Sequence, residues 1–127
     1  MRIVQYIIVL FTVFFAFSQE HPPLVAYDPG VYGAENQNWD VSQTSDQTMY
    51  FANNSGLLEY DGMNWKLYPV HDNSIVRSVK AVDDQIYSGS YMDFGVWKKN
   101  TKNVLEYTSL VQQLDIELIE DEQFWNI

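Results

Sequence analysis

Carboxylates and histidines are the residue types of this 127-residue chain that would carry catalysis or bind a metal. Acidic side chains adjoin at Asp83-Asp84 and at positions 120–122. Glycosidic cleavage needs two carboxylates facing each other about 5–10 Å apart, and a calcium loop needs acids at alternating positions around a glycine. Neighbouring acids in a turn point apart, and His21 and His71 have no third ligand in register. We therefore expect no catalytic residue, no metal site and no cofactor in this segment.

Tryptophans offer a different chemistry, which is the binding of a ligand. An indole ring can stack on the apolar face of a sugar, but it is also large enough to fill a protein core. The chain contains Trp39, Trp65, Trp97 and Trp125. The elements that hold these rings decide between the two roles.

Short strands separated by turns make up the chain from Asn38 onward. Apolar and polar residues alternate in "WDVSQ", as in a half-buried strand. The stretches "NNSG" and "DGMN" supply turn residues that tolerate a positive φ. The predicted strands of the first unit are 39–43, 48–52, 57–60 and 65–70. A second unit repeats this order with predicted strands at 76–82, 86–90, 96–99 and 104–111.

The two units are related by a period of about 40 residues, which is typical of a β-propeller blade. The alignment places Tyr87 on Tyr50 and Gly95 on Gly56, and the closing "FWNI" restates the earlier "NWDV". The predicted fold class is all-β: two four-stranded antiparallel β-propeller blades and the start of a third, preceded by a signal-peptide helix. A propeller closes with about four to eight blades, so we interpret the sequence as the beginning of a longer protein.

The N-terminus has the pattern of a signal peptide. Arg2 precedes an apolar run at 7–15, and Ala16 and Ser18 form a small-x-small cleavage site. The apolar run is shorter than the about 20 residues that span a bilayer. We expect a signal peptide at 1–18 and export of the residues that follow.

Four further segments follow the signal peptide in this interpretation. Prolines and glycines are expected to keep 19–37 an extended lead-in. The first blade is predicted at 38–72, and the second at 73–122, with an inter-blade loop or short helical turn within 109–123. Residues 123–127 are predicted to form the first strand of the third blade.

The first strands of the blades line the central channel of a propeller. Trp39 and Trp125 lie on predicted first strands, and Arg77 aligns with Trp39 in the second unit. The candidates for ligand binding at this channel are therefore Asn38, Trp39, Arg77 and Trp125. Core packing of the two rings and a simple ion pair of Arg77 are the alternatives. Trp65 and Trp97 are expected to pack between neighbouring sheets.

Composition excludes some partners. The chain has 17 acidic and 7 basic residues, a net charge of −10, which repels phosphate backbones and anionic lipids. We expect no contact of this segment with nucleic acid. The absence of cysteine excludes a disulfide framework, while the 46% hydrophobic content suits a globular core.

Two stretches carry a resemblance to a known family. "YGAENQNWDVSQTSDQTMYFANNSGLLEYDGMNWKLYPV" and "SIVRSVKAVDDQIYSGSYMDFGVWKK" resemble the two-component-regulator propeller repeats of bacterial membrane-bound sensors, with "GLLEYDGMNW" as the most specific part. The resemblance covers most of 32–107. It implies a periplasmic sensor propeller followed by a triple-tyrosine immunoglobulin-like domain, a transmembrane helix and a cytoplasmic output, either a LuxR-type helix-turn-helix or a histidine kinase.

The leading hypothesis is therefore a non-enzymatic, exported sensor, the periplasmic domain of an inner-membrane protein that regulates transcription. Its expected partners are an extracellular small molecule or oligosaccharide, the remaining blades and the triple-tyrosine domain of the full-length chain, which is compatible with a homodimer. One alternative is a secreted propeller enzyme, a glycosidase or lyase with catalytic residues in later blades. Another is a protein-binding scaffold. A transmembrane helix and an output domain in the full-length chain would favour the sensor.

Overall fold

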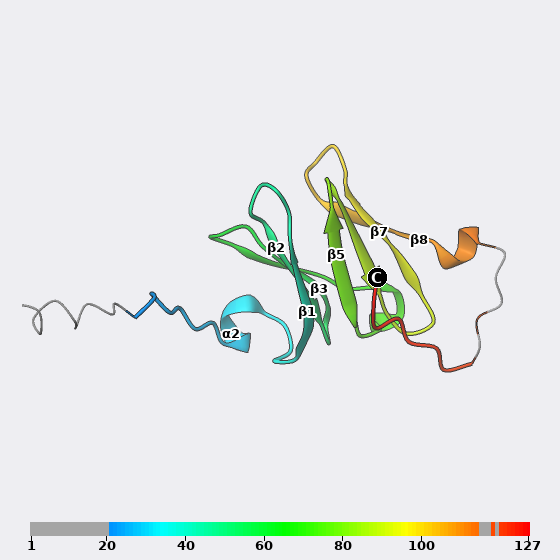
Figure 1. Cartoon of the computed structure of the whole chain (residues 1–127), viewed down its shortest axis with the longest axis horizontal. Helices are drawn as coiled ribbons and strands as arrows, with labels where there is room; N and C mark the ends of the chain where they lie inside the picture. The colour runs from blue at the N-terminus through cyan, green and yellow to red at the C-terminus, as the bar shows by residue number, and fades with distance from the viewer. Residues whose placement is uncertain (1–20, 115–117, 119) are drawn as a thin grey trace, which may run out of the picture.

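The computed structural model describes residues 21–114, 118 and 120–127, and this part of the chain is mostly β (Figure 1). It contains two four-stranded antiparallel sheets in which each strand pairs with the next in sequence. Sheet A consists of β1 (Asn38–Gln43), β2 (Met49–Asn53), β3 (Gly56–Tyr60) and β4 (Trp65–Tyr68). Sheet B consists of β5 (Ser78–Val82), β6 (Gln85–Gly89), β7 (Phe94–Lys99) and β8 (Leu105–Ser109). The prediction of two four-stranded antiparallel units is confirmed.

The predicted signal peptide at 1–18 lies outside the described residues. Among the residues that are described, no helix is long and apolar enough to cross a membrane.

Local turn chemistry explains the hairpins of sheet A. Gly56 follows the β2–β3 turn with φ 136°, and a Cβ at this position would lie 2.4 Å from the carbonyl oxygen of Tyr68. In the next turn the Asp61 carboxylate accepts hydrogen bonds from the backbone N–H groups of Met63 and Asn64 at 2.8 and 2.7 Å. Only glycine fits the first position, and the Asp61 carboxylate stabilises the second turn by accepting from the backbone N–H groups two and three residues on.

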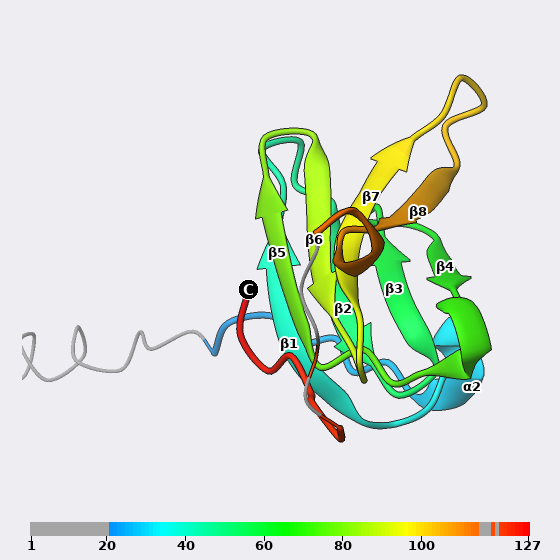
Figure 2. The ribbon, with the colours of Figure 1, turned by 90° about the vertical axis from the view of Figure 1, so that its right-hand side faces the viewer.

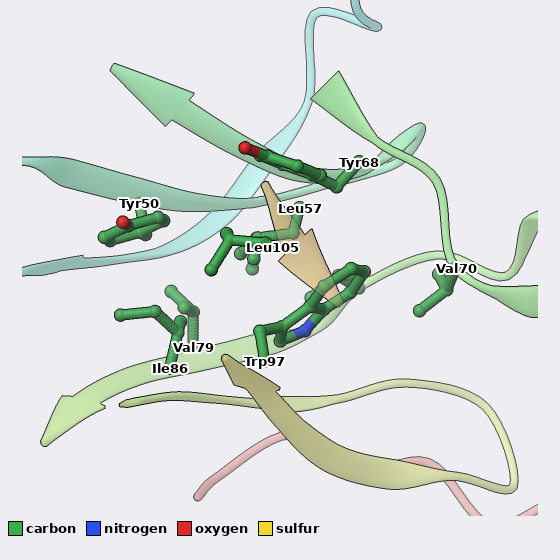
Figure 3. Close-up of a cluster of buried hydrophobic side chains, with 10 residues drawn as sticks. Tyr50, Leu57, Tyr68, Val70, Val79, Ile86, Trp97 and Leu105 are labelled. Atoms are coloured by element: carbon green, nitrogen blue, oxygen red, sulfur yellow. The ribbon is translucent and has the colours of Figure 1, made fainter. Parts of the chain in front are cut away.

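The hydrophobic core lies between the two sheets (Figure 3). Sheet A contributes Tyr50, Leu57 and Tyr68, while Trp97 of sheet B is 2% exposed beneath them. The Trp97 indole N–H donates to Ser88 Oγ at 2.8 Å, so its one polar group is satisfied. The predicted packing of Trp97 between the sheets is confirmed.

The first strands of the two sheets lie side by side (Figures 1 and 2). The backbone N–H of Val79 donates to Asp40 Oδ2 at 2.9 Å, and that of Ala81 donates to Ser42 Oγ at 2.9 Å. Side chains of β1 thus satisfy the free edge of β5 while the two sheets stay separate. The sheets stack as layers instead of merging into one.

The lead-in contains a helical turn that the sequence analysis did not predict. The helix α2 (Pro29–Tyr32) begins with the Asp28 carboxylate accepting from the N–H of Gly30 at 2.9 Å and ends at Gly33 with φ 69°. The expectation of an extended lead-in is wrong at 29–32, because a proline at the first helical position and a glycine just after the last one favour a helix.

Trp65 packs beneath the lead-in, on the face of sheet A that points away from sheet B. Its ring lies 5.2 Å from the ring of Tyr27, 5.5 Å from that of Tyr32 and 4.3 Å from that of Tyr60. The packing role expected for Trp65 is present, but its partners come from the lead-in and from sheet A itself instead of a neighbouring sheet.

The alignment of the two units given by strand pairing differs by one residue from the alignment predicted from the sequence. Tyr50 and Ile86 are the buried second residues of β2 and β6, whereas Tyr87 is half-buried on the opposite face. The match of Tyr50 to Tyr87 was therefore wrong, as was that of Gly95 to Gly56. Residue identity suggested these matches, but a shift of one residue moves a side chain to the other face of a strand.

The segments after β8 are irregular. A short 3-10 helix, η3 (Val111–Gln113), agrees with the predicted loop or helical turn. Residues 123–127 do not form the predicted strand, and only Gln123 pairs, in an isolated bridge with Tyr91. A strand needs a neighbour along its length, and no described segment pairs with residues 124–127.

Candidate functional site

Three of the four predicted channel residues come together in space. The guanidinium carbon of Arg77 lies 4.4 Å from the ring centroid of Trp39 and 4.7 Å from that of Trp125. The two indole rings lie 5.4 Å apart, edge to face. We name this group the Trp–Arg cluster, defined as Trp39, Arg77 and Trp125. The two rings are 42% and 50% exposed, so the cluster opens to solvent.

A bulge in β1 positions Trp39. Asn38 pairs with Asn53 and Asp40 pairs with Ala52, so Trp39 is an extra residue between two regular pairs. A bulge of this kind turns the side chain away from the regular alternation of the strand. The Trp39 indole N–H then donates to Asn54 Oδ1 at 2.7 Å, which holds the ring against the β2–β3 turn.

Arg77 immediately precedes β5. Its backbone N–H donates to the carbonyl of Gly89 at 2.8 Å, and its side-chain Nε–H donates to Gln123 Oε1 at 3.1 Å. Gln123 is itself held by the bridge to Tyr91. The guanidinium is therefore oriented by one hydrogen bond and by the two rings that enclose it.

Trp125 reaches the cluster because the preceding residue docks on sheet B. The backbone N–H of Phe124 donates to Ser90 at 3.1 Å, and its carbonyl accepts from Ser78 Oγ at 2.9 Å. A Cβ at Gly89 would lie 2.5 Å from this carbonyl, so glycine permits the close approach. In Figures 1 and 2 this closing segment, in red, runs beside β5.

Asn38 does not contact the cluster through its side chain. Its Oδ1 accepts from Nδ2 of the buried Asn53 at 2.8 Å, and Nδ2 also donates to the carbonyl of Glu35 at 2.7 Å. Asn38 therefore joins a network that attaches the lead-in to the end of sheet A. Because Trp39 follows it directly, this network also supports the bulge that carries Trp39.

The carboxylate that follows Trp39 in sequence is occupied elsewhere. Asp40 Oδ1 accepts from the N–H of Val41 at 2.8 Å, and Oδ2 accepts from that of Val79. Across the described ranges, the one ion pair is that of His71 with Asp72 at 3.6 Å, on highly exposed side chains. The predicted alternative for Arg77, a simple ion pair, is therefore not formed with any described carboxylate.

A cavity of about 540 Å³ is lined by the β4–β5 connection, the β6–β7 loop and the segment at the end of β8. Tyr91 lines this cavity and also bridges to Gln123, which accepts from Arg77, but Trp39, Arg77 and Trp125 do not line it. The other lining residues are Val70, His71, Asp72, Ser74, Ser90, Met92, Asp93, Ser109, Val111 and Gln112. The sequence analysis missed it because three separate segments form its wall. The one available signal was the stretch "YMDFG", which spans part of the β6–β7 loop and the start of β7 and is longer than the matching "NNSG".

Asp93 organises the wall of this cavity. Its carboxylate accepts from the Tyr107 hydroxyl at 3.0 Å and from Ser109 Oγ at 2.6 Å. Burial of Tyr107, together with the negative charge of Asp93, raises the pKa of the Tyr107 hydroxyl far above its usual value. Tyr107 therefore remains a neutral hydrogen-bond donor at physiological pH.

The acidic pairs and histidines considered for catalysis are dispersed. Asp83 and Asp84 are exposed in the β5–β6 turn, where Asp83 has φ 55°. In the portion of the chain that the structure describes, no three His, Cys, Asp or Glu residues are grouped to hold a metal ion. His21 and His71 are both exposed.

The chemistry available at the Trp–Arg cluster is recognition. Two partly exposed indole faces offer stacking surfaces, and a guanidinium between them offers hydrogen-bond donors. Comparison with protein-family models, with curated proteins and with solved structures found no match to this chain. The interpretation of the site therefore rests on its geometry.

Proposed function

We propose that residues 38–127 begin a β-propeller that senses a small-molecule signal outside the cytoplasm, without catalysis of its own. The observation that carries this proposal is that the segment following each sheet forms a backbone hydrogen bond near the end of that sheet's second strand. The backbone N–H of Val76 donates to the carbonyl of Asn53, the last residue of β2, at 3.2 Å, and that of Phe124 donates to the carbonyl of Ser90, the residue after β6, at 3.1 Å. In both cases the segment docks where the second strand of the preceding sheet ends, as expected of a repeat array in which each unit contacts its neighbours.

This docking determines the positions of two cluster residues. Arg77 comes immediately after Val76, and Trp125 comes immediately after Phe124. In a closed propeller each further unit would place one such residue at the same end of the central channel. The mouth of that channel, where the Trp–Arg cluster lies, is our proposed ligand site.

The signalling role is supported by the sequence resemblance to two-component-regulator propellers and by the signal-peptide pattern at 1–18. In this proposal the propeller is the periplasmic domain of an inner-membrane protein. It is followed by a triple-tyrosine domain, a transmembrane helix and a LuxR-type or kinase output that changes transcription. The net charge of −10 makes direct binding of this segment to nucleic acid unfavourable.

The role can be tested in cells that carry the full-length gene. We expect the double variant Trp39→Ala/Trp125→Ala to reproduce most of the transcript changes caused by deleting the gene, measured by RNA sequencing. Met63→Ala, a change of an exposed side chain in the β3–β4 turn, is the matched control and should leave transcripts unchanged.

Export is checked in the same strains with alkaline phosphatase fused after residue 127, because this enzyme needs the disulfides of an oxidising compartment. An inactive phosphatase fusion, or wild-type transcripts in the double variant, would refute the proposed function.

A further inference from the structure

Arg77 has unused hydrogen-bonding capacity. Its guanidinium carries five N–H donors, and among the described residues the single hydrogen bond of the side chain is that of Nε with Gln123. No described carboxylate lies within ion-pair distance of it, although the chain holds 17 acidic residues against 7 basic ones. In so acidic a chain, an arginine without such a partner is a site where an external anion can bind.

Two carboxylates near the cluster in sequence, Asp40 and Asp121, have other partners. Both oxygens of Asp40 accept backbone hydrogen bonds. Asp121, two residues before Gln123, accepts from the Tyr91 hydroxyl at 2.9 Å. These interactions keep the two carboxylates occupied and leave the terminal nitrogens of Arg77 without a described acceptor.

The geometry around Arg77 also defines the shape of a ligand. Gln123 accepts from Nε, so the edge of the guanidinium that carries the two terminal nitrogens remains available to a ligand. This edge matches the two oxygens of a carboxylate. The rings of Trp39 and Trp125 lie over the guanidinium and are partly exposed. They can therefore cover a flat apolar body attached to the carboxylate.

The net charge of the whole chain limits the negative charge that a ligand can carry. A net charge of −10 repels extended polyanions, so short-range pairing with one guanidinium favours a ligand with a single negative charge. We propose that the Trp–Arg cluster binds a small monocarboxylate with a flat apolar face, either an aromatic acid or a sugar acid. This inference rests on the proposed ligand-sensing function and specifies the class of ligand.

Isothermal titration calorimetry on the purified full-length protein tests the preference for charge. The probes are benzoate against benzamide and glucuronate against glucose, so that each pair differs in the carboxylate and the two pairs distinguish the two sources. We expect at least one carboxylate to bind about tenfold or more tightly than its neutral counterpart, as charge-assisted hydrogen bonds imply. Equal affinities within both pairs, or no binding of either acid, would overturn the proposal.

Variants then test the residue. Arg77→Gln should weaken binding of the preferred acid about tenfold or more, and Arg77→Lys should give an intermediate loss because lysine keeps the charge without the planar fork. Met63→Ala is the control that should bind normally. If Arg77→Gln fails to fold, the acid-to-neutral comparison on the wild-type protein still decides, since it needs no variant. Unchanged affinity in a folded Arg77→Gln protein would contradict the assignment.

The two proposals fail in different experiments. Discrimination between acid and neutral probes together with wild-type transcripts in the double variant would remove the signalling role alone. Altered transcripts together with equal binding of both probe types would remove the ligand class alone.

Discussion

Trp97 and Trp125 are the same residue type in opposite surroundings. Trp97 lies 4.8 Å from the ring of Tyr107, and its N–H bonds to Ser88, whereas Trp125 is half exposed against Arg77 and Trp39. Spacing in the sequence suggested this division, but it left the position of Trp125 undecided between channel and core. The contacts place Trp97 in the core and Trp125 at the surface.

A difference in stability follows at the residue scale. Trp97→Ala should lower the free energy of unfolding by about 3–5 kcal/mol, because it removes a large ring and leaves a cavity. Trp125→Ala should lower it by about 1 kcal/mol or less, since it removes an exposed cation–π contact. Urea denaturation of the full-length variants, followed by circular dichroism, provides the measurement. Similar losses for the two variants would show that Trp125 is core.

At the scale of elements, the lead-in behaves as a cover for sheet A. Tyr32 is buried against Trp65, the Tyr27 and Tyr60 hydroxyls lie 2.8 Å apart, and the Glu35 N–H donates to Ser55 Oγ at 3.0 Å. The turns of the strands could be predicted because their chemistry acts within four residues. The helix α2 was missed because Pro29 was interpreted as a breaker, although it follows an aspartate N-cap.

Removing the contact between the rings of Tyr32 and Trp65 should detach the lead-in from sheet A. Tyr32→Ala eliminates a buried ring worth about 1.5–3 kcal/mol, so we expect protease cleavage within 21–37 to become roughly tenfold faster, since cleavage follows the population of the open form. Limited proteolysis with mass spectrometry gives the rates. Leu24→Ala, at an exposed position of the same segment, is the matched control. Equal cleavage of both variants would mean that the lead-in is not held through Tyr32.

On the scale of the whole molecule, the two sheets leave apolar surface and strand edges uncovered. Val41, Val82 and Ile127 are between 43% and 51% exposed. The outer edges of β4 and β8 also have no strand partner among the described residues. Stacked repeats need neighbours to cover such surfaces, which agrees with the proposal that further blades follow.

Residues 19–127 produced alone should therefore be marginally stable and associate through these surfaces. Analytical ultracentrifugation should show concentration-dependent oligomers, while the full-length protein should sediment as a defined species. A monomer of 19–127 with a cooperative thermal transition would contradict both the expectation and the proposed propeller.

The sequence by itself determined the order of the strands in the two four-stranded units and the approximate positions of their turns. Alternation of side chains, the φ preference of Gly56 and the hydrogen bonds that the Asp61 carboxylate accepts act between near neighbours, so they can be recognised without knowledge of the fold. The sequence also suggested that Trp39, Arg77 and Trp125 occupy equivalent places in successive units.

Only the tertiary structure decided how those residues meet. Arg77 and Gln123 are separated by 46 positions in the chain, and they come together because Phe124 docks on sheet B. The bulge at Trp39 and the one-residue shift between the units depend on the pairing of neighbouring strands, and the cavity beside Tyr91 depends on how three separate segments pack. Packing between layers is set by the shapes of side chains from both sheets at once, and no local pattern in a single strand contains that information.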